Sequence, residues 1–422
     1  MNAVPVGSMP LAARLGRTAL ERLHADHGTS FYLLDLERAR SNIRELTQAF
    51  RAIYARTAIG HSYKTNYIPS LCALTYAEGA YAEVVSGMEY DLACRLAAAP
   101  QRILLNGPVK SEALLERALL ASSLVNVDSS QEVEVVRAIA QRHPDRTLRV
   151  GLRVNFALDG LKRSRFGIDA EGEELATAHA RLTEKGNVAV EGLHGHFGGD
   201  RSAASYRQRT ERMIGLVDRL FSAGPPKFID VGGGLAGPMP EALRAQFKKP
   251  PPTYAEYAEA IATPMRERYG VGPDAPELIV EPGMGLFSDV LEFVCRVAAT
   301  KTIGGVRHAI VTGSIYNVKP TLNTFDMPLL VVPGERAAAP ACRWVVSGYT
   351  CMEIDILHSG AHTDLAVGDH VVFANTGAYT VVLKPPFIET APAIIAVDAN
   401  STMTVARRAE TLDDLMTTYP IA

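Results

Sequence analysis

The chain has 422 residues, of which 47% are hydrophobic and 21% are charged, and its formal net charge is -3. These values are typical of a soluble globular protein long enough for two domains, and they give no reason to expect a nucleic-acid or membrane partner. We find no stretch of membrane length and no export signal. Five cysteines without metal-binding spacing favour the cytoplasm, and we predict no metal site.

The first two thirds of the chain alternate predicted strands with predicted helices. An amphipathic helix near Leu11 to His24 precedes a strand over Phe31–Leu36 and a helix from about Glu37 to Tyr54. Eight further strands are predicted at 57–63, 82–85, 103–106, 124–127, 149–154, 190–196, 228–231 and 278–280, with helical periodicity between them. This alternation predicts a parallel sheet, and the count of eight favours a (β/α)₈ (TIM) barrel over an open doubly wound sheet.

After residue 285 the pattern changes to short strands separated by Gly, Pro and Asn turns. We predict strands at 293–297, 308–312, 329–332, 343–347, 370–375, 379–383 and 394–397, and a last helix at 410–416. The early strand has no place in an eight-strand barrel, so we assign it to this second domain. The predicted organisation is a lead-in and strand over 1–36, a barrel over 37–285, and an all-β, sandwich- or barrel-like domain over 286–422.

Lys64 lies at the end of the first barrel strand, in the segment Ser62-Tyr63-Lys64-Thr65-Asn66. Because a strand end in an α/β protein faces the ligand crevice, a lysine there is placed to react. An amine among apolar neighbours loses its proton and attacks carbonyl carbons, which is the chemistry of a Schiff-base lysine. On this segment alone, a solvated lysine at a loop start is the commoner alternative.

The other strand ends carry polar residues or glycine. They are Glu83, Ser86 and Gly87 at the second strand, Arg153 and Asn155 at the fifth, His194 and His196 at the sixth, Asp230 with Gly232, Gly233 and Gly234 at the seventh, and Glu281 with Gly283 at the eighth. Catalytic side chains of barrels collect at this rim, and phosphate sites usually lie near strand seven. Three glycines suit backbone amides around a phosphate, although tight turns use them as often.

A rim lysine, a phosphate cradle and a rim carboxylate together meet the needs of pyridoxal 5′-phosphate (PLP). The lysine would carry the cofactor, and the carboxylate would keep its pyridine nitrogen protonated. Single members also have simpler explanations. Arg153 fits a buried structural ion pair, and His194 or His196 fits a satisfied core histidine.

These motifs, in this order, resemble the alanine-racemase-fold PLP decarboxylases, the group of diaminopimelate, ornithine and arginine decarboxylases. The resemblance runs from about Phe31 to Tyr419 and includes the family's lysine motif, its S-K-F-G segment at Ser164–Ile168 and its G-L-H-x-H-x-G-S motif at Gly192–Gly199. It implies the following barrel roles: PLP on Lys64, His196 stacked on the pyridine ring, phosphate held at Gly232, Gly233 and Gly234, Glu281 on the pyridine nitrogen, and cofactor contacts from Glu83, Arg153, Gly199 and Gly283.

Two motifs of the β domain extend the resemblance. Gly348-Tyr349-Thr350-Cys351 resembles the family's G-P-x-C, and Gly377-Ala378-Tyr379-Thr380 resembles its G-A-Y. The resemblance implies a homodimer in which Cys351 of one chain completes the site of the other and returns a proton to Cα. It also implies that Tyr379 touches the cofactor.

The departures fall where the substrate would bind. Diaminopimelate decarboxylases read C-E-S-x-D where this chain has Met352, Glu353 and Asp355, and their E-P-G-R arginine is Met284. The candidate substrate-binding residues are Met284, Lys319, Asn323, Met352, Glu353 and Asp355. Strand alternation should turn Glu353 to the face opposite Met352, so we do not expect Glu353 to line the pocket. A charged distal group would lose its partners, so we do not expect diaminopimelate as substrate.

We therefore predict a PLP-dependent α-decarboxylase for an unusual or conjugated amino acid, such as an intermediate of a siderophore or other natural product. A racemase or epimerase on the same fold is one alternative, with Lys64 and either Cys351 or Tyr379 as its two bases. A cofactor-less regulatory homologue of a decarboxylase is the other. The retained Lys64, Glu281 and Cys351 argue against it.

Overall fold

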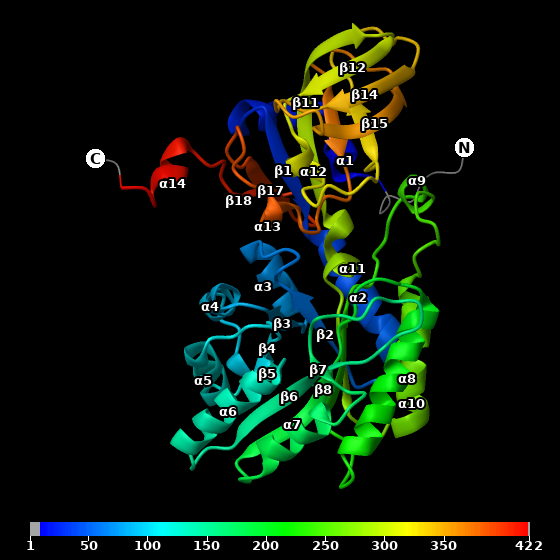
Figure 1. The fold of residues 1–422 in the computed structure, drawn as a ribbon. Helices are drawn as coiled ribbons and strands as arrows, with labels where there is room; N and C mark the ends of the chain where they lie inside the picture. Colours follow the sequence, from blue (N-terminus) through cyan, green and yellow to red (C-terminus); the bar gives the residue numbers. More distant parts are fainter. Residues whose placement is uncertain (1–8, 421–422) are drawn as a thin grey trace. The chain divides into compact units, whose positions relative to one another are not determined.

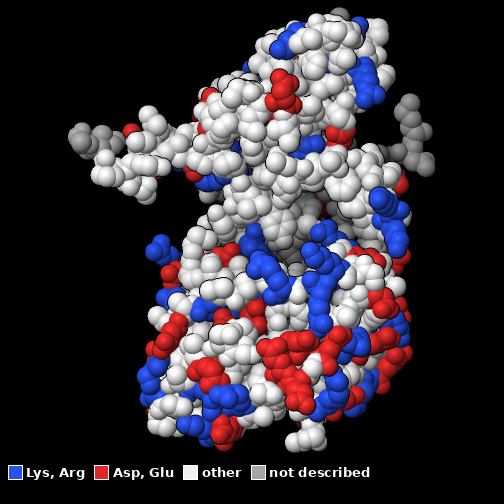
Figure 2. All heavy atoms as spheres, viewed as in Figure 1, with Lys and Arg blue, Asp and Glu red and all other residues white. Residues whose placement is uncertain are grey.

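The computed structural model describes residues 9–420. This part of the chain forms two compact units (Figure 1). The barrel unit comprises residues 42–237 and 251–285, and the β unit comprises residues 9–41, 238–250 and the remainder from 286. Among the described residues no helix is long and apolar enough to cross a membrane. On the face shown in Figure 2, acidic and basic side chains lie interspersed over the barrel unit, in keeping with the near-neutral charge.

Eight parallel strands close the barrel. They are β2 (Thr57–Ser62), β3 (Tyr81–Val84), β4 (Ile103–Leu105), β5 (Leu124–Val127), β6 (Leu148–Asn155), β8 (Val188–His194), β9 (Phe228–Gly233) and β10 (Glu277–Glu281). Each pairs with the next, and β10 pairs with β2, so the described sheet has no free edge. The short β7 (Ile168–Asp169) pairs with β6 outside this ring. The predicted (β/α)₈ barrel is confirmed, and every strand lies within two residues of its predicted limits.

Helices alternate with the barrel strands, as Figure 1 shows, and the first of them precedes β2 and spans the division between the two units. They are α2 (Leu36–Ile53), α3 (Pro69–Ala77), α4 (Gly87–Arg95), the 3₁₀ turn Pro100–Arg102, α5 (Glu112–Leu120), α6 (Ser130–Arg142), α7 (Glu174–Thr183), α8 (Ala203–Leu220) and α10 (Tyr254–Tyr269). Several begin at a serine whose hydroxyl accepts the third amide of the helix, at Ser86, Ser111, Ser129 and Ser202. These caps end each strand-to-helix loop at a defined residue and so fix the loop that carries the site residues.

The β unit is a nine-stranded sheet. Its strands are β1 (Ser30–Asp35), β11 (Leu291–Ile303), β12 (Val306–Val311), β13 (Leu329–Val332), β14 (Cys342–Ser347), β15 (Ile356–Thr363), β16 (His370–Phe373), β17 (Ala393–Val397) and β18 (Met403–Arg407). Its helices are α1 (Leu11–His27), α9 (Glu241–Arg244), the 3₁₀ turn Ser288–Val290, α12 (Ile315–Val318), α13 (Thr380–Leu383) and α14 (Leu412–Met416), while α11 (Gly283–Phe287) spans the division between the units. The early strand β1 lies between β11 and β17.

The β unit departs from the predicted elements in several places. The predicted strand over 379–383 is wrong: Tyr379 has φ 63° and begins the single helical turn α13. The strands β15 and β18 were not predicted, since β15 contains Gly, Ser and His and β18 is largely exposed. Residues 238–250, predicted within the barrel, belong to the β unit, where Phe247 stacks on Phe325 with ring centroids 4.6 Å apart.

Candidate active site

Side chains from the carboxyl ends of several barrel strands meet at one rim of the barrel. Lys64 lies in the turn after β2, which is closed by a 3.0 Å bond from the Thr65 amide to the Ser62 carbonyl. The Lys64 amine donates to the carboxylate of Glu83 on β3. Lys64 is about a third exposed and Glu83 is buried. The lysine is therefore accessible while its charge partner is shielded from water.

His61 supports the loop that carries Lys64. Its Nδ1 lies 2.7 Å from the Thr75 hydroxyl and its Nε2 lies 2.8 Å from the Asn66 carbonyl oxygen. Because a carbonyl only accepts, Nε2 carries the hydrogen. Burial lowers the pKa of His61 to about 3, so the ring is neutral. His61 thus anchors the far side of the lysine loop without adding charge to it.

Glu281, at the end of β10, lies in a group of buried polar side chains. Asn106 donates to its carboxylate, His194 Nε2 lies 3.5 Å from it, and Asp230 is adjacent. Burial alone would raise the pKa of Glu281, but the neighbouring His194, Lys64 and Asp230 hold it well below its usual range. Burial and repulsion from Glu281 raise the pKa of Asp230 well above its usual range. The pair therefore has one proton, which Asp230 holds, and Glu281 is ionised.

His196 and the glycines after β9 form a second group. The Gly233 amide donates to His196 Nδ1 at 2.9 Å, and burial with the Lys64 charge lowers the pKa of His196 to about 3. A Cβ at Gly232 would lie 2.9 Å from the same nitrogen. The Gly232 amide donates to Asp230 at 2.8 Å. Since two amides of the predicted cradle are engaged within the chain, a phosphate here needs amides beyond Gly233.

The remaining barrel candidates lie at the same rim. Arg153 is buried and pairs with Asp128 at 2.8 Å, which matches the simpler of its two explanations. Gly199 is exposed with φ 104°, and Gly283 approaches the lysine loop so closely that a Cβ would lie 2.2 Å from the Thr65 hydroxyl. Gly283 therefore has to lack a side chain for the Lys64 loop to take this position.

In the β unit, Cys351 and Met352 lie on a loop built around Asp355. Asp355 is buried, and its carboxylate accepts the Ile315 amide at 2.6 Å and the Thr350 amide at 2.9 Å. A Cβ at Gly348 would lie 2.2 Å from this carboxylate. The segment is a turn, not a strand, so the alternation argument about Glu353 is wrong. Asp355 holds the loop from inside, and Cys351 and Met352 are exposed.

The other β-unit candidates differ in how they are engaged. Lys319 is buried and its amine donates to the Phe325 carbonyl at 2.9 Å. Asn323 bonds to Thr321 and to the Phe325 amide. Both therefore order their own loop. Tyr379 takes a left-handed backbone conformation that is rare for an aromatic residue.

Met352 lies beside aromatic side chains. The Tyr316 hydroxyl is 3.7 Å from its sulfur, and the Tyr316 and Phe387 rings meet edge to face with centroids 5.9 Å apart. Met352 therefore contacts one aromatic residue, Tyr316, which itself packs against Phe387.

Residues 40–288, more than half of the chain, match the family described as pyridoxal-dependent decarboxylase, pyridoxal binding domain. The chain belongs to this family. It is 25% identical to the diaminopimelate decarboxylase of Aquifex aeolicus, over 94% of this chain and 92% of that protein. It is 27% identical to the uncharacterized protein y4yA of Sinorhizobium fredii, over 85% of each. The crystal structure of diaminopimelate decarboxylase from Helicobacter pylori complexed with L-lysine matches with a TM-score of 0.80 at 23% identity, covering 94% of this chain and 98% of that one.

The protein is accordingly a PLP-dependent amino-acid decarboxylase, and its barrel residues fit the cofactor. The rim offers an accessible amine, an ionised carboxylate, a neutral imidazole and a glycine turn that no larger residue could form. The Nδ1 atom of buried His194 has no hydrogen-bond partner in the described chain, whereas its Nε2 faces Glu281. Such an atom is expected where a bound molecule normally supplies contacts.

Sequence reasoning assigned no role to three residues of this site. Asn106 stands at the end of β4, so the rule that located Lys64 and Glu281 would also have found it. Asp230 was noted only as the start of a glycine turn, and its proton follows from its distance to Glu281. His61 points to the far side of its strand, and only the fold shows that it reaches Asn66.

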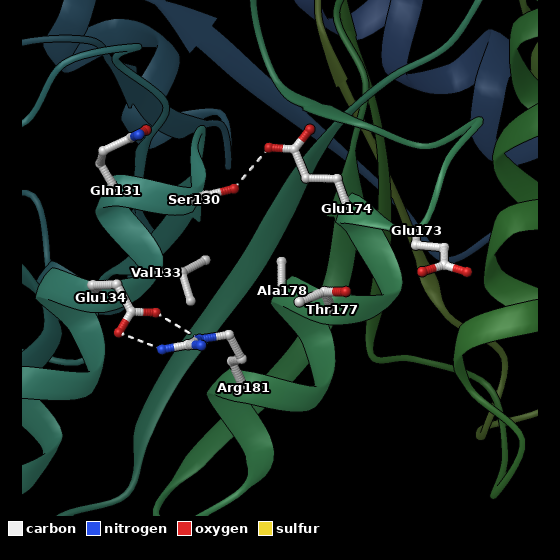
Figure 3. Close-up of a pocket in the computed structure, with 9 residues that line it drawn as sticks. All are labelled: Ser130, Gln131, Val133, Glu134, Glu173, Glu174, Thr177, Ala178 and Arg181. Carbon is white, nitrogen blue, oxygen red and sulfur yellow. Dashed lines mark hydrogen bonds and ion pairs between the residues drawn. The ribbon is translucent and has the colours of Figure 1, made fainter.

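A separate groove lies on the outside of the barrel between α6 and α7 (Figure 3). Arg181 makes two 2.8 Å bonds to Glu134 across the groove, and the Ser130 hydroxyl donates to Glu174 at 2.7 Å. The groove contains none of the strand-end residues, so we assign it no part in catalysis.

Proposed function

We propose that this decarboxylase acts on an amino acid whose distal group is bulky or uncharged, such as a conjugated biosynthetic intermediate, rather than on diaminopimelate. The observation that carries the proposal is Met352 beside Tyr316, at the place where the resembling enzymes have a carboxylate. Thioether and aromatic surfaces suit apolar groups and leave an ammonium unpaired. With Asp355 and Lys319 bonded within their own loops, neither is free to replace the lost charge partner.

In the barrel, we propose that Lys64 carries PLP and that Glu281 accepts the hydrogen of its pyridine nitrogen. PLP, when bound, supplies a ring that takes up the electron pair left at Cα when CO₂ departs. The ionised state of Glu281 supports its assignment, because only a carboxylate stabilises a protonated pyridine nitrogen. Neutral His196, fixed by the Gly233 amide, would place an uncharged ring face against the cofactor.

We propose a homodimer in which Cys351 of the partner subunit donates the proton that returns to Cα. Exposure of Cys351 on a loop held rigid from inside supports this, because a residue that acts on another chain has to be presented at the surface. We place the enzyme in the reducing cytosol, where its free cysteines would persist.

Purified enzyme incubated with a panel of amino acids tests the substrate proposal. The panel contains meso-diaminopimelate, L-ornithine, L-lysine, and amino acids carrying aromatic, acyl or other uncharged distal groups. CO₂ release and product mass are followed together. We expect primary-amine products from the last group. Release of CO₂ from diaminopimelate alone would contradict the proposal, and inversion at Cα without CO₂ would point to a racemase.

Subunit exchange tests the shared site. Lys64→Ala and Cys351→Ala homodimers should each be nearly inactive, and a mixture allowed to exchange subunits should recover activity, because each mixed dimer has one wild-type composite site. Absence of recovery, with exchange demonstrated by differently tagged chains, would show that the site is built within one chain.

A further inference from the structure

The carboxylates of Glu83 and Glu281 are linked by a single side chain. The Asn106 amide nitrogen lies 3.2 Å from Glu83 Oε1 and also donates to Glu281 Oε1. A primary amide has two hydrogens, so each carboxylate receives one. Asn106, Glu83 and Glu281 are each at most 3% exposed. Water therefore does not compete for these bonds.

A second asparagine fixes the orientation of the first. Asn126 donates to the Asn106 side-chain oxygen at 2.7 Å, and Asn126 is fully buried. If the Asn106 amide were reversed, its oxygen would face two carboxylates and its nitrogen would face another N–H group. The donors of Asn106 can therefore point only toward Glu83 and Glu281.

Two glycines make room for this arrangement. A Cβ at Gly60 on β2 would lie 3.3 Å from Glu281 Cγ and 3.6 Å from Glu83 Cβ. A Cβ at Gly151 on β6 would lie 2.0 Å from the Asn126 oxygen. The missing side chains let the two carboxylates approach across β2 and let Asn126 reach Asn106. The network thus depends on residues from six barrel strands, β2, β3, β4, β5, β6 and β10.

We infer that Asn106 is a positioning residue of the active site, which holds the carboxylate facing Lys64 and the carboxylate assigned to the pyridine nitrogen in one hydrogen-bonded unit. The inference rests on the proposed roles of Lys64 and Glu281. An amide donates a hydrogen bond to each carboxylate without adding a charge. A lysine or arginine in its place would compete with Lys64 for Glu83, and an aspartate would add a third negative charge.

The charge requirement makes the inference testable. Asn106→Asp keeps the size of the side chain but replaces two donors with a carboxylate. Asn106→Ala removes the donors without adding charge. Asn187→Asp is the matched control: Asn187 precedes β8 at the opposite end of the barrel, where its amide donates to the Ala140 carbonyl at 2.9 Å. The control makes the same chemical change away from the cofactor.

In cofactor-free protein, competitive acylation followed by peptide mapping gives the pKa of Lys64. We expect Asn106→Asp to raise it by about 1 or more, because an added negative charge favours the ammonium form. In the PLP-loaded enzyme, the acid limb of kcat/KM should move to higher pH in both Asn106 variants, and further in Asn106→Asp. Asn187→Asp should lower thermal stability and leave both the Lys64 pKa and the acid limb of kcat/KM unchanged.

The inference is overturned if the Asn106 variants fold and bind PLP with the wild-type Lys64 pKa and acid limb. If Asn106→Asp does not fold, the pH of the acid limb in Asn106→Ala alone tests the inference, and a value equal to that of the wild type overturns it. Borohydride reduction of the wild type separates the two levels of the argument. Label on another lysine means that the proposed function of Lys64 is wrong. Label on Lys64, together with Asn106 variants whose Lys64 pKa and acid limb equal those of the wild type, overturns only the role of Asn106.

Discussion

The rim of the barrel and the loop of residues 348–355 are built in opposite ways. At the rim, polar groups are buried and bonded to one another, so that Lys64, Glu83, Asn106 and Glu281 form one chain of contacts. In the loop, the buried carboxylate of Asp355 accepts backbone amides, and the side chains proposed to meet a substrate are exposed. Removing one side chain of the rim leaves a buried charge without its partner, which costs stability. Substituting an exposed loop residue costs little free energy of folding. Under the proposed roles, the cofactor site is held by buried hydrogen bonds and the proposed substrate contact lies on an exposed loop.

The largest effect should come from Lys64. Lys64→Ala should lower kcat on the order of 10⁴-fold, because no other amine replaces it at the rim. Lys64→Arg should be equally inactive but more stable than Lys64→Ala, since it keeps a cation beside Glu83. Borohydride reduction of the wild type with peptide mapping should place the pyridoxyl group on Lys64. Activity of Lys64→Ala above a hundredth of the wild-type value would show that the rim does not depend on Lys64.

Removing the support of the loop should have the next largest effect. Asp355→Ala leaves two buried amides without an acceptor, and we expect a loss of about 3 kcal/mol in the free energy of unfolding, measured by denaturant titration. Asp398→Ala is the control, because Asp398 also accepts two amides, from Asn400 and Thr402, but in an exposed turn. Equal losses in the two variants would show that burial of Asp355 contributes nothing.

The predictability of these two regions from sequence also differed. The barrel strands and Lys64 followed from periodicity and the strand-end rule, since each is a local pattern. The network around Asn106 did not, because it joins residues from six strands that come together only when the barrel closes. In the β unit, the predicted strand at 379–383 failed at the left-handed Tyr379, and the turn at 352–355 was taken for a strand. Both depend on backbone conformations that side-chain patterns do not reveal.

A single loop substitution should shift substrate preference. Met352→Glu restores a carboxylate for a distal ammonium, and we expect kcat/KM for L-ornithine or L-lysine to rise about tenfold. Met403→Glu makes the same change on exposed β18 and should leave kcat/KM unchanged. A similar rise in both variants would mean that general surface charge, rather than contact with the substrate, is responsible.

The smallest effect concerns the proton on Asp230. Its pKa is raised in the folded protein, so its contribution to stability is present at low pH and is lost as pH rises through that raised pKa. Asp230→Asn retains a hydrogen-bond donor toward Glu281 and cannot ionise. We expect kcat within about threefold of wild type near neutral pH. The melting temperature of the variant relative to wild type should increase as the pH is raised, and a constant difference would contradict the shared proton.

The central claim is that an intact cofactor site serves a rewritten substrate contact, and kcat/KM of the PLP-loaded wild type for meso-diaminopimelate tests it most directly. We predict negligible CO₂ release, under conditions in which amino acids with larger uncharged distal groups are turned over. A kcat/KM for diaminopimelate of about 10⁴ M⁻¹s⁻¹ or more, within the usual range of enzymes on their own substrates, would contradict the account.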